Sequence, residues 1–128
     1  MQPTTGGPWM RFFRSFYYAF AGLFFLFRTQ RNARVELCAG IAACGLAVWL
    51  HLPRVDWAIL FLTIALVLIL EGLNTSIEIA IDLACPEYDP RAKVAKDLAA
   101  GMVLIASIAS VGVGIAILGI PLWQRWAR

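Results

Sequence analysis

The chain has 128 residues, of which 61% are hydrophobic, and its formal net charge at pH 7 is only +3. The mean hydropathy of +0.75 is too high for a soluble globular domain, in which about half of the residues are apolar. These values exclude a soluble domain. They also argue against nucleic acid as a partner, because the basic residues are not gathered on a soluble fold. We expect a single all-α domain built in a lipid bilayer.

The amino-terminal part of the chain divides into two segments. Residues 1–8 are rich in Gly, Pro and Thr, and we expect them to be a flexible terminus ahead of one domain covering residues 9–128. Residues 9–29 are rich in aromatic residues and carry arginines near both ends. This pattern is typical of an amphipathic helix that lies on the membrane surface. A short spanning helix is the alternative, although a span needs roughly 20 apolar residues and the apolar run here is shorter.

Three further apolar stretches predict membrane-spanning helices. The first covers about residues 36–52 and is rich in Ala and Gly, which allow close helix packing in lipid. The second covers about residues 55–85 and becomes polar toward its end. The loop Pro86–Pro90 has a proline at each end and separates the second span from the third, which covers about residues 92–123.

Lys and Arg residues are distributed unequally between the two sides that these spans define. The amino-terminal segment and the 82–97 loop share one side, which holds eight of the eleven Lys and Arg residues: Arg11, Arg14, Arg28, Arg31, Arg34, Arg91, Lys93 and Lys96. The other side holds only Arg54, Arg125 and Arg128. Positive residues are retained on the cytoplasmic side of membrane proteins. We therefore expect the amino terminus and the 82–97 loop to be cytoplasmic.

A line of polar residues interrupts the second span. On a helix that turns about 100° per residue, its members fall within roughly a 100° arc: Glu71, Asn74, Thr75, Glu78 and Asp82. Ionisable groups inside a span are costly and indicate a functional site by default. In a lone protomer this polar line would face lipid, so we expect a neighbouring subunit to cover it.

The residue types of the polar line form an inventory for phosphoryl transfer. Glu71 lies deepest and can accept a proton from a hydroxyl group that arrives through the lipid, and Asn74 can orient that hydroxyl. Glu78 can bind a divalent cation, since such cations prefer oxygen ligands. Lys96 and Asp97 begin the third span, where they can meet nucleotide phosphates. An ion or proton pathway and a polar seam between helices are alternatives, because neither a Walker A sequence nor a protein-kinase glycine loop is present.

Two motifs together closely resemble the signature of the small prokaryotic diacylglycerol kinase and undecaprenol kinase family. They read Glu71-xx-Asn74-Thr75-xx-Glu78-xxx-Asp82 and Ala95-Lys96-Asp97-xx-Ala100-Gly101, and the resemblance covers nearly the whole chain. It implies a homotrimer of three-span protomers in the bacterial inner membrane, with active sites shared between subunits. It also implies ATP and Mg²⁺ as cofactors and a membrane lipid alcohol as the substrate.

The resemblance implies a role for each site residue. Glu71 is the expected catalytic base, and Asn74 is expected to lie beside the acceptor hydroxyl. Glu78 is the expected metal ligand. The residues expected around the nucleotide and its metal are Arg11, Tyr18, Gln30, Glu78, Glu87, Lys96 and Asp97.

Two positions depart from the family pattern. A second metal-binding glutamate usually precedes the first span, where this chain has Gln30, which offers only a neutral oxygen. The histidine usual in the loop is Asp89 here. The stretch Asn32-Ala33-Arg34, the proline-bounded loop and the run from Ala95 to Gly101 look more like undecaprenol kinases than enterobacterial diacylglycerol kinases. Undecaprenol is therefore the expected substrate, with diacylglycerol as the alternative.

Overall fold

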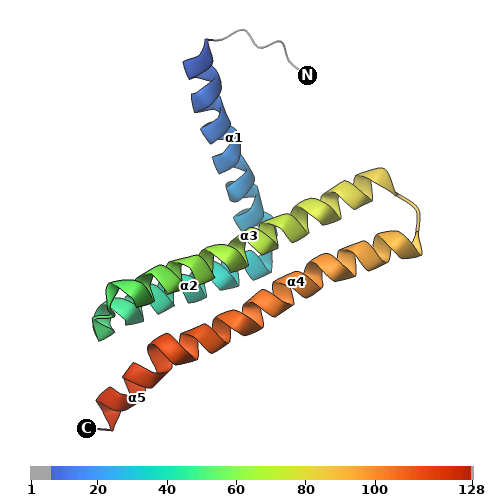
Figure 1. Cartoon of the computed structure of the whole chain (residues 1–128). Helices are drawn as coiled ribbons and strands as arrows, with labels where there is room; N and C mark the ends of the chain where they lie inside the picture. Colours follow the sequence, from blue (N-terminus) through green and yellow to red (C-terminus); the bar gives the residue numbers. More distant parts are fainter. Residues whose placement is uncertain (1–6, 128) are drawn as a thin grey trace.

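The computed structural model describes residues 7–127, so most of the flexible terminus expected for residues 1–8 lies outside the described residues. All regular elements in this range are helical, as the composition predicts. They are α1 (Pro8–Thr29), α2 (Arg31–Leu50), α3 (Arg54–Ala84), α4 (Pro90–Gly114), a π-helical segment (Ile115–Gly119) and α5 (Ile120–Trp126). The last three follow one another as a single long helix (Figure 1).

Three helices are long and apolar enough to cross a membrane: α2, α3 and the continuous helix Pro90–Trp126. This confirms the prediction of three candidate spans. Their ends differ from the predicted ones, because α2 already begins at Arg31 and the third helix runs from Pro90 to Trp126. We placed the predicted ends where the apolar residues stop. A helix, however, continues through charged residues for as long as its backbone hydrogen bonds continue. The helix α3 packs against both α2 and α4.

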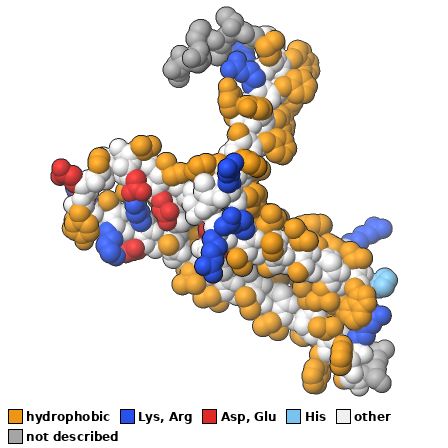
Figure 2. Space-filling model, turned by 180° about the vertical axis from the view of Figure 1, so that it is seen from behind, with side chains coloured by type: hydrophobic (Ala, Val, Ile, Leu, Met, Phe, Trp, Pro, Cys, Tyr) orange, Lys and Arg blue, Asp and Glu red, His pale blue; other side chains and the backbone are white. Residues whose placement is uncertain are grey.

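The helix α1 is not among the three candidate spans. It leaves the bundle at a steep angle and meets α2 and α3 near its carboxyl end, where Leu26 is its one buried residue (Figure 1). It ends at Thr29 because Gln30 has an extended backbone (φ −95°, ψ 116°). All of its aromatic side chains except half-buried Phe27 are exposed, and hydrophobic side chains cover much of its surface in Figure 2.

Small residues let α2 approach α3 closely. A Cβ atom added at Gly40 would lie 3.1 Å from Cγ2 of Ile64, which is tighter than ordinary van der Waals contact. Farther along the bundle, Ala47 and Leu60 form a buried cluster with Ile117 and Leu118 of the π-helical segment. This apolar cluster lies near the amino-terminal end of α3, away from the polar line. Acidic side chains gather at the opposite end of the bundle (Figure 2).

Candidate functional site

The polar line runs along α3 from the bundle interior to its exposed end. Glu71 and Thr75 are buried, with 3% and 5% of their surface exposed. Asn74 and Glu78 are half-buried, and Asp82 is exposed. This corrects the expectation that a lone protomer leaves the whole line facing lipid. Helices of the same protomer already cover its deep half, which needs no neighbour.

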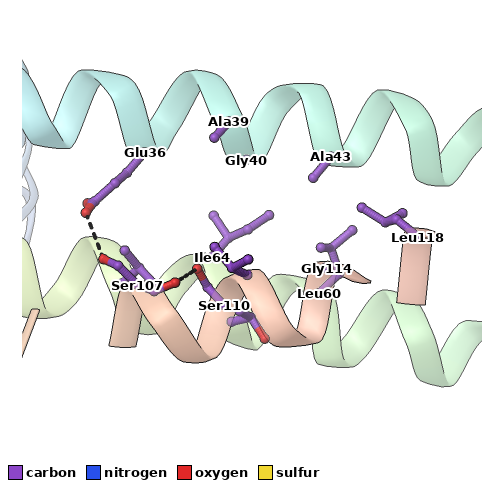
Figure 3. Close-up of a pocket in the computed structure, with 13 residues that line it drawn as sticks. Glu36, Ala39, Gly40, Ala43, Leu60, Ile64, Ser107, Ser110, Gly114 and Leu118 are labelled. Carbon is purple, nitrogen blue, oxygen red and sulfur yellow. Dashed lines mark hydrogen bonds between the residues drawn. The ribbon is translucent and has the colours of Figure 1, made fainter. Parts of the chain in front are cut away.

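Glu36 is a functional candidate that the sequence analysis missed. It lies in α2, close enough to Glu71 for the two carboxyl groups to interact electrostatically. Its Oε1 accepts a hydrogen bond from Ser107 Oγ of α4 at 3.5 Å (Figure 3). Its Oε2 is buried without a hydrogen-bond partner among the described residues. The available signal was that Glu36 is the one acidic residue of α2, at the predicted start of the first span.

Two apolar cavities lie near the deep part of the polar line, although Glu71 lines neither of them. The cavity between α2, α3 and α4 has a volume of about 290 Å³, and its lining changes from Glu36 and Ser107 at one end to Leu60 and Leu118 at the other (Figure 3). The second cavity, of about 620 Å³, lies between α1 and α3 and reaches Thr75. Hydrocarbon chains suit such walls, and a polar head group suits the carboxylate end.

Asn74 connects the deep and the shallow parts of the line. Its Nδ2 donates a hydrogen bond to Glu78 Oε1 at 3.0 Å. Its Oδ1 is buried and has no partner among the residues that the structure describes. Buried polar atoms in native proteins are nearly always hydrogen-bonded. A hydroxyl group entering from a cavity would supply the missing donor.

The exposed end of the line continues into a pocket of about 380 Å³. The pocket is formed by the end of α3, the connecting loop and the start of α4, and Asp82, Glu87, Lys93 and Lys96 line it. Lys96 forms an ion pair with Asp82 and so joins α4 to α3. The structure therefore brings Lys96 and Glu87 together with the exposed end of the polar line.

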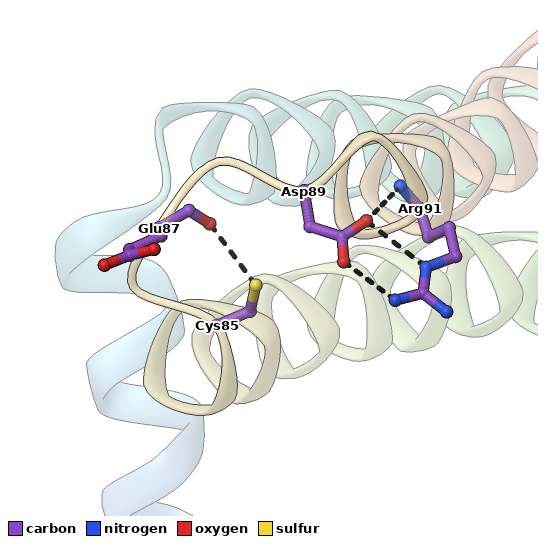
Figure 4. A network of polar contacts seen from close by, with 4 residues as sticks. All are labelled: Cys85, Glu87, Asp89 and Arg91. Atoms are coloured by element: carbon purple, nitrogen blue, oxygen red, sulfur yellow. Dashed lines mark hydrogen bonds and ion pairs between the residues drawn. The ribbon is translucent and has the colours of Figure 1, made fainter.

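Asp89 sets the start of α4. Its side chain accepts hydrogen bonds from the backbone N–H of Arg91 at 2.7 Å and from the guanidinium Nη2 of Arg91 at 3.0 Å (Figure 4). These bonds from Arg91 hold the pKa of Asp89 below its ordinary value, so this carboxylate is charged at neutral pH. Asp89 therefore serves as a helix cap, followed by Pro90 in the first turn.

Of the residues predicted around the nucleotide, only Glu87 and Lys96 line this pocket. Asp97 and Glu78 do not, although Asp97 pairs with Lys93 of the pocket wall. Three others, on or next to α1, lie away from it within one protomer. Arg11 and Tyr18 lie on the exposed part of α1 that projects from the bundle (Figure 1). The Tyr18 hydroxyl accepts a hydrogen bond from Arg14 at 3.1 Å. Gln30 lies between α1 and α2, and its backbone N–H donates to the Leu26 carbonyl. These three residues can reach the pocket only if another subunit supplies them or if α1 moves.

Glu78 and Gln30 are the predicted metal-site residues, with oxygen atoms that could bind a metal ion carried by phosphate. Among residues 7–127 there is no group of three or more His, Cys, Asp or Glu residues placed to hold a metal ion. Glu78 is half-exposed and supplies carboxylate oxygens, and Gln30 could supply an amide oxygen. Mg²⁺ typically binds one or two carboxylates and completes its shell with substrate phosphates and waters. Glu78 fits that pattern.

These features define a small helical membrane protein with a buried carboxylate site that opens at one end of the bundle. The model of the family described as prokaryotic diacylglycerol kinase matches residues 17–118. The chain belongs to this family of lipid kinases, which confirms the resemblance found in the sequence.

The relatives carry two different names. A diacylglycerol kinase of Synechocystis is 49% identical over 109 residues, which are 84% of this chain but only 62% of that protein. An undecaprenol kinase of Bacillus subtilis is 40% identical over 84% of this chain and 87% of its own length. A diacylglycerol kinase of Escherichia coli is 32% identical over 84% of this chain and 87% of its own length.

Proposed function

We propose that the protein transfers the γ-phosphate of ATP to the primary hydroxyl group of a membrane lipid alcohol. The observation that carries this proposal is the continuity of the site. At one end an apolar cavity reaches Thr75, one helical turn from buried Glu71, and at the other end Lys96 and Glu87 line an open pocket. A lipid can thus approach the polar line from the bilayer, and a nucleotide can approach the same line from the water.

The chain's own residues can perform the transfer as follows. On arrival the lipid hydroxyl donates its single hydrogen bond to Asn74 Oδ1, which lacks a partner among residues 7–127. The O–H then turns from Asn74 to Glu71 before the transfer. Glu71 takes the hydroxyl proton as the hydroxyl oxygen bonds to the γ-phosphorus and the bond between that phosphorus and the β–γ bridging oxygen breaks. ADP leaves, and the phosphorylated lipid remains in the membrane. Lys96 would face the phosphates, and Glu78 would hold Mg²⁺, whose charge would offset that of the phosphates.

Undecaprenol is the acceptor that we propose. Three stretches of the sequence resemble undecaprenol kinases, and they include the loop Pro86–Pro90 and the first turns of α4. The alternative, diacylglycerol, has its own support in the 49% identity to the Synechocystis protein of that name. Both lipids present a primary hydroxyl group at the membrane interface, so the chemistry of Glu71 and Asn74 suits either one.

A lipid panel with radiolabelled ATP tests the function. Purified protein with ATP and Mg²⁺ should phosphorylate undecaprenol faster than diacylglycerol, and should consume no ATP without a lipid alcohol. Sealed inside-out vesicles should be active with added ATP, whereas right-side-out vesicles should not, because we place the 82–97 loop in the cytoplasm. Failure across a broad panel would contradict the kinase, and proton or ion flux without nucleotide would instead support a pathway protein.

We also propose a homotrimer with shared active sites and with α1 on the membrane surface. The support is that Arg11, Tyr18 and Gln30 lie away from the pocket within one protomer, while α1 exposes aromatic side chains along its length. A neighbouring subunit could bring its α1 to the pocket. Chemical crosslinking in native membranes or mild detergent should give a trimer, and a result showing only monomers would contradict the assembly.

A further inference from the structure

The first turns of α4 present two lysines to the pocket, Lys93 and Lys96. The proposed phosphoryl transfer uses only Lys96. Lys93 and Lys96 are three residues apart, a spacing that places side chains on the same side of a helix. Both line the pocket formed with the end of α3 and the connecting loop. Lys96 belongs to the proposed nucleotide site, whereas Lys93 has been given no function.

Each of the two lysines forms an ion pair with a carboxylate. Lys96 pairs with Asp82 of α3, and Lys93 Nζ lies 2.5 Å from Oδ2 of Asp97, four residues later in α4. Both side chains of the Lys93–Asp97 pair are more than half exposed. An exposed ion pair adds little to stability, so a more highly charged anion can replace Asp97 at small cost.

The charges around the pocket show why a second lysine is needed. Three carboxylates line it: Asp82 is paired with Lys96, Asp89 is paired with Arg91, and Glu87 has no ion-pair partner among residues 7–127. Without Lys93, an anionic nucleotide would therefore meet an excess of negative charge. Once it leaves Asp97, which does not line the pocket, Lys93 can offset Glu87.

We propose that Lys93 is a second phosphate-binding residue, and that it exchanges Asp97 for the nucleotide phosphates when the nucleotide binds. This inference rests on the proposed kinase function. A lysine ammonium is a point charge on a flexible stem, so Lys93 can turn from Asp97 to the pocket without movement of α4. The exchange also leaves the Asp97 carboxylate free to accept a hydrogen bond from the nucleotide.

Nucleotide binding to the purified full-length protein tests the exchange. Lys93→Met should weaken ATP binding about tenfold, the effect expected for one charge-assisted hydrogen bond, with a smaller loss for AMP, which has one phosphate. A fluorescent trinitrophenyl-ATP probe displaced by ATP, ADP or AMP measures these affinities. In the lipid kinase assay the KM for ATP should rise by a similar factor while kcat stays within about twofold. Lys93→Arg should restore most of the affinity.

Arg28→Met is the matched control, because it removes the same unit charge on the same side of the membrane but from the end of α1, where the guanidinium lies over Phe24. It should leave ATP affinity unchanged. Equal losses for ATP and AMP in Lys93→Met, or an equal loss in Arg28→Met, would overturn the phosphate contact. An active parent enzyme with an unchanged Lys93→Met variant overturns this inference alone, whereas a parent that binds no nucleotide overturns the proposed function with it.

Discussion

Replacing Glu71 by glutamine should lower turnover by about 10²–10⁴-fold, the usual cost of a lost general base. Glutamine has nearly the same size and keeps the packing of α3, but its amide cannot take the hydroxyl proton. Because only 3% of Glu71 is exposed, water cannot easily replace it as the base. Nucleotide affinity should change little, since Glu71 lies deeper than the Lys96 pocket. The measurement is kcat for lipid phosphorylation alongside nucleotide binding.

Two further variants show whether the effect is specific to Glu71. Asp56→Asn removes a carboxylate from the first turn of the same helix, far from the polar line, and should keep full activity. Glu36→Gln tests the carboxylate that interacts with Glu71. If Glu36→Gln abolishes turnover while Glu71→Gln stays near normal, the base is Glu36 and our assignment is wrong.

The spans could be predicted from the sequence because lipid imposes a simple requirement. An apolar run of sufficient length must be helical there, since no water is present to bond its backbone. The details that escaped prediction depend on packing. The π-helical segment carries Ile117 and Leu118 into a cluster with Ala47 and Leu60, and no local pattern specifies that contact. The angle at which α1 leaves the bundle likewise depends on its contacts with α2 and α3.

The candidate site was predictable to the extent that it lies on one helix. The residues from Glu71 to Asp82 share a face because of helical periodicity alone. Glu36 was not predicted because it lies near Glu71 only through the packing of two helices that are far apart in sequence. A single acidic residue near the end of a span also gives no periodic signal. The cap formed by Asp89 could have been predicted from the sequence, because Asp followed by Pro is a common start of a helix.

Glu78 should control the metal requirement rather than the proton transfer. Glu78→Gln removes a carboxylate that Asn74 orients through a 3.0 Å hydrogen bond. Because loss of even a supporting residue at a metal site typically costs 10–100-fold in affinity, we expect the Mg²⁺ concentration for half-maximal activity to rise at least about tenfold. A Mg²⁺ titration of kinase activity at fixed ATP measures this. An unchanged half-maximal concentration would remove Glu78 from the metal site.

Gln30 should respond in the opposite direction if it contributes to the same site. Metal affinity at an oxygen site depends on the number of charged ligands, and the neutral amide of Gln30 cannot offset the charge of Mg²⁺. Gln30→Glu should therefore lower the half-maximal Mg²⁺ concentration, with less change at saturating metal. Its backbone conformation between α1 and α2 is ordinary (φ −95°, ψ 116°), so glutamate fits without strain. A titration that overlays the parent curve would mean that Gln30 is only an interfacial residue and that Glu78, phosphate oxygens and waters complete the shell.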